Sequence, residues 1–285
     1  SGCIHAHSSP TGGQNCAVFH KEIKVEVPFT PALAEQVEQM QQAKGKKLVA
    51  TAQDPKERIR LAMLAPDAEY QSSVPLPKPK DYTGPRSYFE FLQTVQPQGE
   101  HGDTFGYRTI NTDALGWVIA RVTGRSVSQL LSERIWRRLG AEQDAYFTVD
   151  SIGTPFAGGG LNTGLRDLAR FGEMLRNNGR FNGQQILPKS VVDDIRGGGD
   201  KAAFAKAGYA LLPGWSYRNM WWVTHNPHGA FMARGVHGQR IYVDPKAQMV
   251  IVRYASHPVA SNSANDPVTI PAFEALGQLL ASQPR

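Results

Sequence analysis

Three stretches of the chain hold the residues that could carry out a reaction. Tyr107 stands directly before a predicted helix cap, and a phenol within hydrogen-bond reach of a reacting group can transfer protons. Residues 158–175 read GGGLNTGLRDLARFGEML, and residues 234–245 read RGVHGQRIYVDP. A single site built from these stretches requires elements that bring three distant segments together.

A second possible chemistry lies at the start of the chain, where metal-ligand residue types are close in sequence. These residues are Cys3, His5, His7, Cys16 and His20. The His-Ala-His stretch is similar to the His-x-His of amidohydrolase barrels, where both histidines reach a metal from one strand end. No barrel repeat follows it. A metal site at His5 and His7 is therefore a weak hypothesis, and we expect no metal or other cofactor.

The spacing of apolar residues predicts the elements that must position these side chains. Apolar residues at helical spacing, with caps and terminal glycines, predict helices over 85–95, 111–122, 126–139, 161–175 and 268–281, and a short helix after Pro188. Alternation predicts a strand or hairpin over 16–29 and strands over 220–224, 231–234, 240–243 and 249–254. Helices followed by an antiparallel meander and a closing helix predict an α+β fold.

The three stretches, in this order, resemble the serine β-lactamase and penicillin-binding-protein-like hydrolases, with the 6-aminohexanoate-dimer hydrolase and carboxylesterase branch as the nearest match. The resemblance covers residues 73–285, and the glycine-plus-helix stretch is its most specific part. It implies an antiparallel sheet flanked by helices together with an all-helical subdomain. We expect residues 76–200 to form the helical subdomain and 201–285 the sheet and last helix. Residues 1–75 are of uncertain origin and could belong to the α/β layer.

The resemblance also implies roles for individual residues. Tyr107 matches the tyrosine of the Tyr-x-Asn/Ser motif, which shuttles protons, and Thr109 takes the place of that motif's third residue. Gly235 would let substrate lie along the strand edge, and the Val236 backbone N–H would donate to the oxyanion. Ala233 occupies the position where the family usually has a lysine, which is a large departure from its pattern.

Three further residues are candidates for contact with substrate, and two of them have a structural alternative. His237 could bind substrate, although a histidine that supports the strand turn is slightly favoured. His257 follows the last strand and could reach the rim of the site. Trp222 is equally compatible with a pocket wall and with core packing.

The nucleophile of the family's reaction is missing from its expected motif. The reaction depends on Ser-x-x-Lys, in which the serine attacks the carbonyl and the lysine takes its proton. No lysine of this chain follows a serine, threonine or cysteine at that spacing. The leading hypothesis is hydrolysis of small linear amides or esters through an acyl-serine intermediate. The alternatives are a non-catalytic protein whose pocket binds such ligands or peptidoglycan fragments, and a metal-dependent hydrolase.

Composition limits the partners. The 285 residues are 41% hydrophobic and 20% charged, as expected for a globular protein, and no apolar run reaches the ~18–20 residues that span a membrane. The net charge of +6 is scattered and not interleaved with aromatic residues, so we expect a small-molecule substrate, mildly favoured if anionic or zwitterionic, and no nucleic acid. Two cysteines fit both a bacterial cytoplasm and a periplasm. No feature indicates an oligomeric state.

Overall fold

The computed structural model describes residues 15–20, 23–28, 80–95, 102–150 and 152–283, and for the first two ranges only the backbone. Its helices are α4 (Tyr88–Leu92), α5 (Thr109–Thr123), α6 (Val127–Leu131), α7 (Leu165–Arg176), α8 (Lys189–Gly197), α9 (Lys201–Lys206) and α10 (Asp266–Ser282). A π-helical turn, Ser132–Trp136, continues α6, and 3₁₀ turns span Val236–Gly238 and Asn262–Ala264.

The centre of the fold is a sheet of seven strands in the order β2-β1-β11-β10-β9-β8-β7, each antiparallel to its neighbours. These strands are β1 (Asn15–His20), β2 (Ile23–Pro28), β7 (Ser216–Arg218), β8 (Trp221–Val223), β9 (Phe231–Arg234), β10 (Arg240–Asp244) and β11 (Met249–Arg253). Two small ribbons pair β3 (Tyr146–Phe147) with β4 (Leu161–Asn162) and β5 (Arg180–Phe181) with β6 (Gln184–Gln185).

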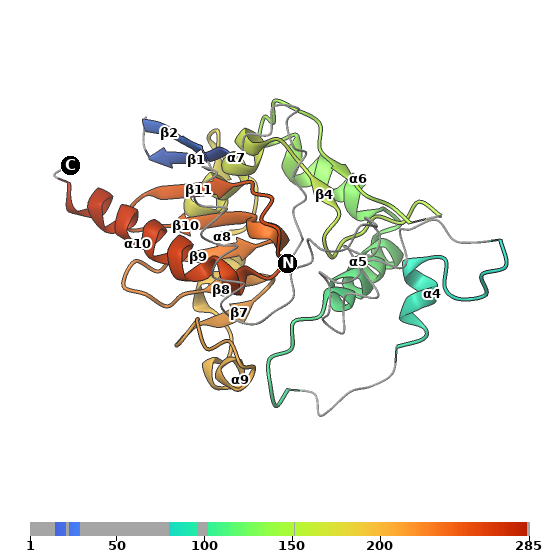
Figure 1. Ribbon diagram of the computed structural model, residues 1–285. Helices are drawn as coiled ribbons and strands as arrows, with labels where there is room; N and C mark the ends of the chain where they lie inside the picture. The colour runs from blue at the N-terminus through green and yellow to red at the C-terminus, as the bar shows by residue number, and fades with distance from the viewer. Residues whose placement is uncertain (1–14, 21–22, 29–79, 96–101, 151, 284–285) are drawn as a thin grey trace.

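Helices cover both faces of the sheet, because successive side chains of a strand point to opposite faces. α10 packs on one face, where Met232 and Tyr242 meet its apolar residues, and α7 packs on the other face against β10 and β11 (Figure 1). Gly172 permits the close approach of α7, since a Cβ at this position would lie 2.6 Å from Val250 Cγ1. The sheet with its two helical layers forms one half of the molecule.

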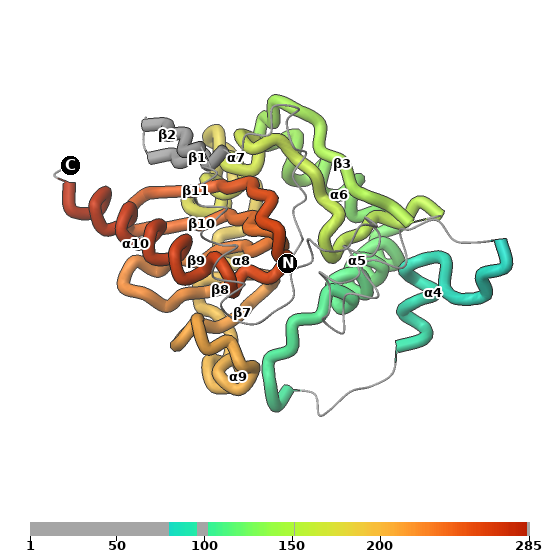
Figure 2. The backbone as a smooth tube through the Cα atoms, in the orientation of Figure 1, coloured from blue at the N-terminus to red at the C-terminus, as the bar shows by residue number. Residues whose placement is uncertain are grey.

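The other half carries α4, α5 and α6, which lie beside one another (Figure 1). Ser126 caps α6 in a capping box with Gln129, which satisfies two otherwise unpaired backbone N–H groups. The segment that leads into α5 passes beside α9 of the sheet half, as Figure 2 shows. This crossing segment contains Tyr107, so the predicted proton-transferring residue lies where the two halves are in contact.

The α+β fold predicted from the sequence is confirmed, and β9 has the predicted bounds. Several bounds differ: α7 begins at Leu165 because residues 161–162 pair as β4, and α5 begins at Thr109 rather than 111. The helix predicted over 85–95 is limited to α4, and the one predicted over 126–139 is α6 followed by the π-helical turn. α7 and α8 come from the stretch expected in the helical subdomain but pack on the sheet, and the division at residue 200 stays a prediction. Within the part of the chain that the structure describes, no helix has the length and apolar character needed to cross a membrane.

Candidate active site

The segment before α5 holds Tyr107 against the sheet half. The backbone N–H of Phe105 donates to the carbonyl of Ala203 in α9 at 3.1 Å, and Lys206 Nζ lies 2.7 Å from a carboxylate oxygen of Asp103. Two contacts to one short helix therefore hold the segment at Asp103 and at Phe105. Tyr107 follows two residues after Phe105 and packs against Trp222 of β8.

An aromatic cluster receives Tyr107. Its ring stacks on Trp222 with centroids 6.0 Å apart and planes at 24°, and meets Tyr217 edge-on at 6.2 Å. Phe105 and Phe204 pack into the same cluster. Trp222 is only 5% exposed, so it lies in the core beneath Tyr107, and its predicted contact with substrate stays a prediction.

A pocket of about 240 Å³ opens beside this cluster. Tyr107, Arg108 and Asn111 form one wall from the start of α5, and Tyr217, Asn219 and Met220 form the other from the β7–β8 turn. Asn219 and Met220 both have left-handed backbone conformations, with φ of 47° and 69°. Such strain in a methionine concentrates at functional sites, and this turn is held by hydrogen bonds from Arg218 and Asn219 to Asp194.

Thr109 lies beneath the triple-glycine loop. It is 1% exposed, and a Cβ at Gly158 would lie 2.4 Å from its Cγ2. The N–H of Gly158 also donates to Asp113 Oδ1 at 3.0 Å, so two residues of α5 hold this loop. The structure gives the Thr109 methyl a packing role, and the predicted orientation of substrate by its hydroxyl stays a prediction.

The turn after β9 carries the predicted oxyanion donor. The Gly235 N–H donates to the Gln239 carbonyl at 2.9 Å, and the Gly235 carbonyl accepts from Asn262 Nδ2 at 3.0 Å. These bonds fix the backbone on either side of Val236, the half-buried first residue of the 3₁₀ turn. The role of the Val236 N–H stays a prediction, but hydrogen bonds to Gln239 and Asn262 hold the turn that presents it.

His237 and His257 tie this turn to the segment after β11. His237 has φ of 57°, its ring Nδ1 lies 2.7 Å from the His257 carbonyl, and the His257 N–H donates to the His237 carbonyl at 3.1 Å. The N–H of His237 donates to Ala260 at 3.1 Å. The structural alternative for His237 thus has direct support in these contacts, and its contact with substrate stays a prediction.

His257 is buried behind the turn rather than on the rim where the sequence suggested it. It is 3% exposed, and its ring packs under Gly238. Burial, and then the charges of Arg253, Arg240 and His237, lower the pKa of His257 to about 4. Its Nε2 accepts a hydrogen bond from Arg253 Nη2, as expected for a neutral ring at pH 7.

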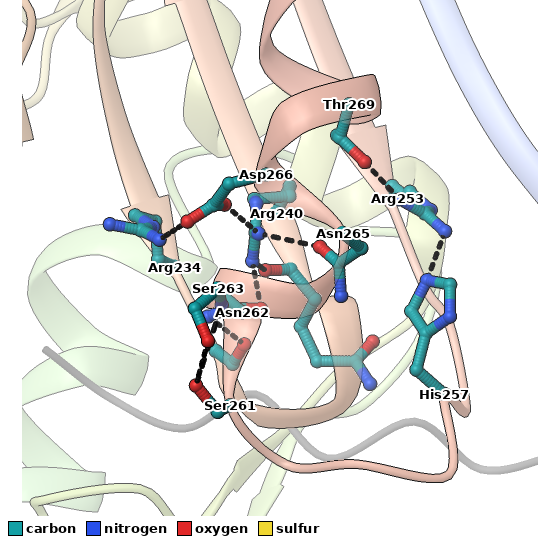
Figure 3. A network of polar contacts seen from close by, with 12 residues as sticks. Arg234, Arg240, Arg253, His257, Ser261, Asn262, Ser263, Asn265, Asp266 and Thr269 are labelled. Carbon is teal, nitrogen blue, oxygen red and sulfur yellow. Dashed lines mark hydrogen bonds and ion pairs between the residues drawn. The ribbon is translucent and has the colours of Figure 1, made fainter. Parts of the chain in front are cut away.

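Sequence reasoning missed the buried network beside the turn, which Figure 3 shows. Arg234 pairs with Asp266, and Arg240 donates to the same carboxylate at 2.9 Å. Arg234 also lies over the Trp222 ring, with Cζ 4.4 Å from its centroid. An arginine at the end of a central strand was a sequence signal for such a network, but its partner stands 32 positions later.

The suggested metal ligands His5, His7 and Cys3 lie outside the described residues, as do the side chains of Cys16 and His20. In the described ranges, no group of three or more histidine, cysteine, aspartate or glutamate side chains could hold a metal ion.

Comparison with known proteins identifies relatives of the whole arrangement. The Beta-lactamase family model matches residues 33–270. A 6-aminohexanoate-dimer hydrolase from Paenarthrobacter ureafaciens is 38% identical over 175 residues, which is 61% of this chain and 44% of the relative. The chain therefore matches less than half the length of this curated relative.

Two solved structures extend the comparison. A protein from Bacillus anthracis, whose name assigns it as a 6-aminohexanoate-dimer hydrolase, is 30% identical with a TM-score of 0.73, covering 96% of this chain and 81% of its own. A β-lactamase from Mycobacterium bovis is 17% identical with a TM-score of 0.56, covering 95% and 96%, which is a likeness of fold alone.

Proposed function

The chain belongs to the Beta-lactamase family of hydrolases, and we propose that it hydrolyses small linear amides or esters through an acyl-serine intermediate. In this reaction a serine oxygen bonds to the substrate carbonyl carbon, the amine or alcohol leaves with a proton, and water then releases the acid. Of the solved relatives, the one assigned as a 6-aminohexanoate-dimer hydrolase favours a linear amide.

The observation that carries the proposal is the position of Tyr107. Its phenol stands at the wall of the pocket, on the Trp222 ring that also contacts Arg234. Gly235 and Val236 follow Arg234 directly in the chain. The proposed proton-transferring phenol therefore packs on a ring that also contacts Arg234, and the proposed backbone donor follows Arg234 in the chain. Acyl transfer uses both a proton-transferring group and an oxyanion donor.

The nucleophile is the part of the mechanism that the experiment must identify, because no Ser-x-x-Lys occurs in the 285 residues. The protein is incubated with a fluorophosphonate, which phosphonylates an activated serine with loss of fluoride, and its intact mass is recorded. Turnover of a p-nitrophenyl ester is followed in parallel. We expect one stoichiometric adduct that peptide mapping assigns to a single serine.

Replacement of the mapped serine by alanine should abolish both the adduct and the turnover. A chain that gives neither adduct nor turnover, while its circular dichroism shows it folded, contradicts hydrolysis by this protein. Turnover that persists after the serine is replaced contradicts the acyl-serine route alone.

A further inference from the structure

Several large apolar residues of α5 point outward, while its fully buried face consists of Thr109, Asp113 and Gly116. This inner face lies against the residues that lead into the glycine loop. A Cβ at Gly116 would lie 2.8 Å from Ala157 Cβ, and Asp113 accepts the N–H of Gly158. The space inside α5 is therefore filled by small and polar groups, and burial does not explain the apolar residues on its other side.

Three of these outward residues form a stripe along the helix. Leu115, Val118 and Val122 are spaced three and four positions apart, so they share one face of α5. They are 47%, 45% and 81% exposed. At 1.5 Å of rise per residue the stripe is about 10 Å long. Single exposed apolar residues are common on proteins, but an aligned set of large ones indicates a surface that binds something.

The stripe begins at the pocket. Leu115 lines the pocket together with Asn111 and Thr112 of the first turns of α5. Val118 follows Leu115 by about one helical turn on the same face, and Val122 follows by another. The apolar surface of the pocket therefore continues onto the outside of α5, away from Tyr107.

The facing wall of the pocket adds a second apolar residue, Met220. Its backbone is left-handed, with φ of 69°, and Asp194 holds the turn through hydrogen bonds from Arg218 and Asn219. The protein thus keeps a methionine at this wall in spite of an unfavourable backbone conformation. An unbranched thioether adapts its shape to an apolar ligand, as the methionines of other binding surfaces do.

We propose that the pocket and the stripe together bind a linear alkyl chain of the ligand. The chain would pass between Leu115 and Met220 and then lie along Val118 and Val122. The site would therefore select amides or esters whose alkyl segment is long enough to leave the pocket. This inference rests on the proposed function for the class of ligand, but it concerns binding and requires no turnover.

The test is a binding measurement with two uncharged amides that differ only in chain length. Isothermal titration compares N-butylacetamide with N-octylacetamide, the second below the concentration at which it forms micelles. A methylene that is half covered on an open helix face should tighten binding by about twofold, which is the square root of the factor for full burial. Four added methylenes should therefore lower the dissociation constant by about sixteenfold.

Val118→Asp places a charge in the middle of the stripe and leaves the pocket residues in place. We expect this variant to bind the butyl probe as the unchanged protein does, and to reduce the preference for the octyl probe to within about threefold. Val268→Asp is the matched control. Val268 is 47% exposed on α10 and does not line the pocket, so the same substitution there should keep the preference. Circular dichroism checks that both variants are folded, and Val118→Thr, which keeps the branched shape, replaces a Val118→Asp that is not.

The proposal is wrong if the unchanged protein prefers the octyl probe by less than about fivefold, or if the substitution at Val118 leaves the preference as it was. The other possible occupant of the stripe is a second copy of the chain. Sedimentation of the unchanged protein and of Val118→Asp tests this alternative. A dimer that the substitution dissociates would make the stripe an interface between copies and would also overturn the proposal.

This result is independent of the test of hydrolysis. A preference for the longer chain that depends on Val118, together with absent fluorophosphonate labelling, would support the alkyl site and contradict the hydrolase. Labelling and ester turnover without any dependence of binding on chain length would do the reverse.

Discussion

Tyr107 is the side chain on which the proposed chemistry depends most. We expect Tyr107→Phe to keep the stacking on Trp222 and to lower turnover of a p-nitrophenyl ester by about 10²–10⁴-fold, the usual contribution of a positioned acid or base. The steady-state rate is divided by the concentration of competent sites, which the amount of fluorophosphonate adduct gives. Labelling should slow but remain specific.

Tyr146→Phe is the matched control, since Tyr146 is 49% exposed on β3 and does not line the pocket. Its turnover should equal that of the unchanged protein. Equal turnover in Tyr107→Phe and Tyr146→Phe would remove the phenol of Tyr107 from the mechanism.

His257 makes the stability of the protein depend on pH. Its pKa falls from 6.5 to about 4 on folding, so the unfolded state binds the proton more readily. The stability that this neutral ring contributes is complete above pH 6.5 and is lost as the pH falls through 4. The shift corresponds to roughly 3 kcal/mol in the free energy of unfolding.

Urea denaturation at pH 7.5 and pH 4 measures this dependence, with His257→Gln as the comparison. Glutamine can still accept a hydrogen bond from Arg253 but does not titrate. The decrease in the free energy of unfolding between pH 7.5 and pH 4 should therefore be smaller in His257→Gln by roughly 3 kcal/mol. His225, whose pKa burial also lowers, titrates in both proteins and cancels. Equal losses in the two proteins would contradict a neutral, buried His257.

At the scale of elements, the turn between β9 and β10 depends on Gly238. Its φ is +92°, and a Cβ there would lie 2.3 Å from His257 Cδ2. We expect Gly238→Ala to lower the free energy of unfolding by about 2–4 kcal/mol, from the backbone conformation and the clash together. Since the turn also presents Val236, ester turnover should fall with it.

Gly229→Ala separates the two causes. Gly229 also has a left-handed backbone, with φ of +66°, but its nearest neighbour would be Arg196 Nη2 at 3.7 Å. Gly229→Ala should lower the free energy of unfolding by about 1–2 kcal/mol, from the backbone conformation alone. Denaturation that shows the same cost at both glycines would mean that the His257 contact is not tight.

The sequence predicted the long or strongly patterned elements and missed several short ones. The predicted bounds of β9, β10 and α10 are close to those in the structure, because the alternation or helical spacing of their apolar residues is uninterrupted. β7 and α9 were not predicted, since three polar or aromatic residues and a six-residue alanine-rich helix give little periodic signal. The expected apolar stripe on α5 is largely exposed, with Val122 at 81%, so helical spacing did not establish burial there.

At the scale of the whole molecule, the candidate site is made by contacts that no local pattern encodes. Tyr107 was identified from its neighbours in sequence, but the cluster that receives it comes from α9, β7 and β8, about a hundred residues later. The Arg234–Asp266 pair likewise joins a strand end to the start of α10. Motifs located the residues, while only the packing of the two halves showed which of them face one another.

Phe105 tests whether this packing positions the site. It stacks on Phe204 at 5.2 Å and meets Tyr217 at 4.8 Å, so it anchors the crossing segment in the aromatic cluster of the sheet half. Because Phe105 is only half-buried, we expect Phe105→Ala to cost about 2–3 kcal/mol, less than a fully buried phenylalanine. Turnover should also fall, since Tyr107 loses the anchor two residues before it.

Phe89→Ala is the comparison, because Phe89 is 37% exposed and stacks on Trp117 within the helical half. Phe89→Ala should lower the free energy of unfolding by about 1 kcal/mol and leave turnover unchanged, as it removes one aromatic pair that does not line the pocket. Denaturation and ester turnover are measured for both variants. A loss of stability in Phe105→Ala with full turnover would mean that Tyr107 keeps its position without the aromatic anchor, and that the crossing segment serves only to join the two halves.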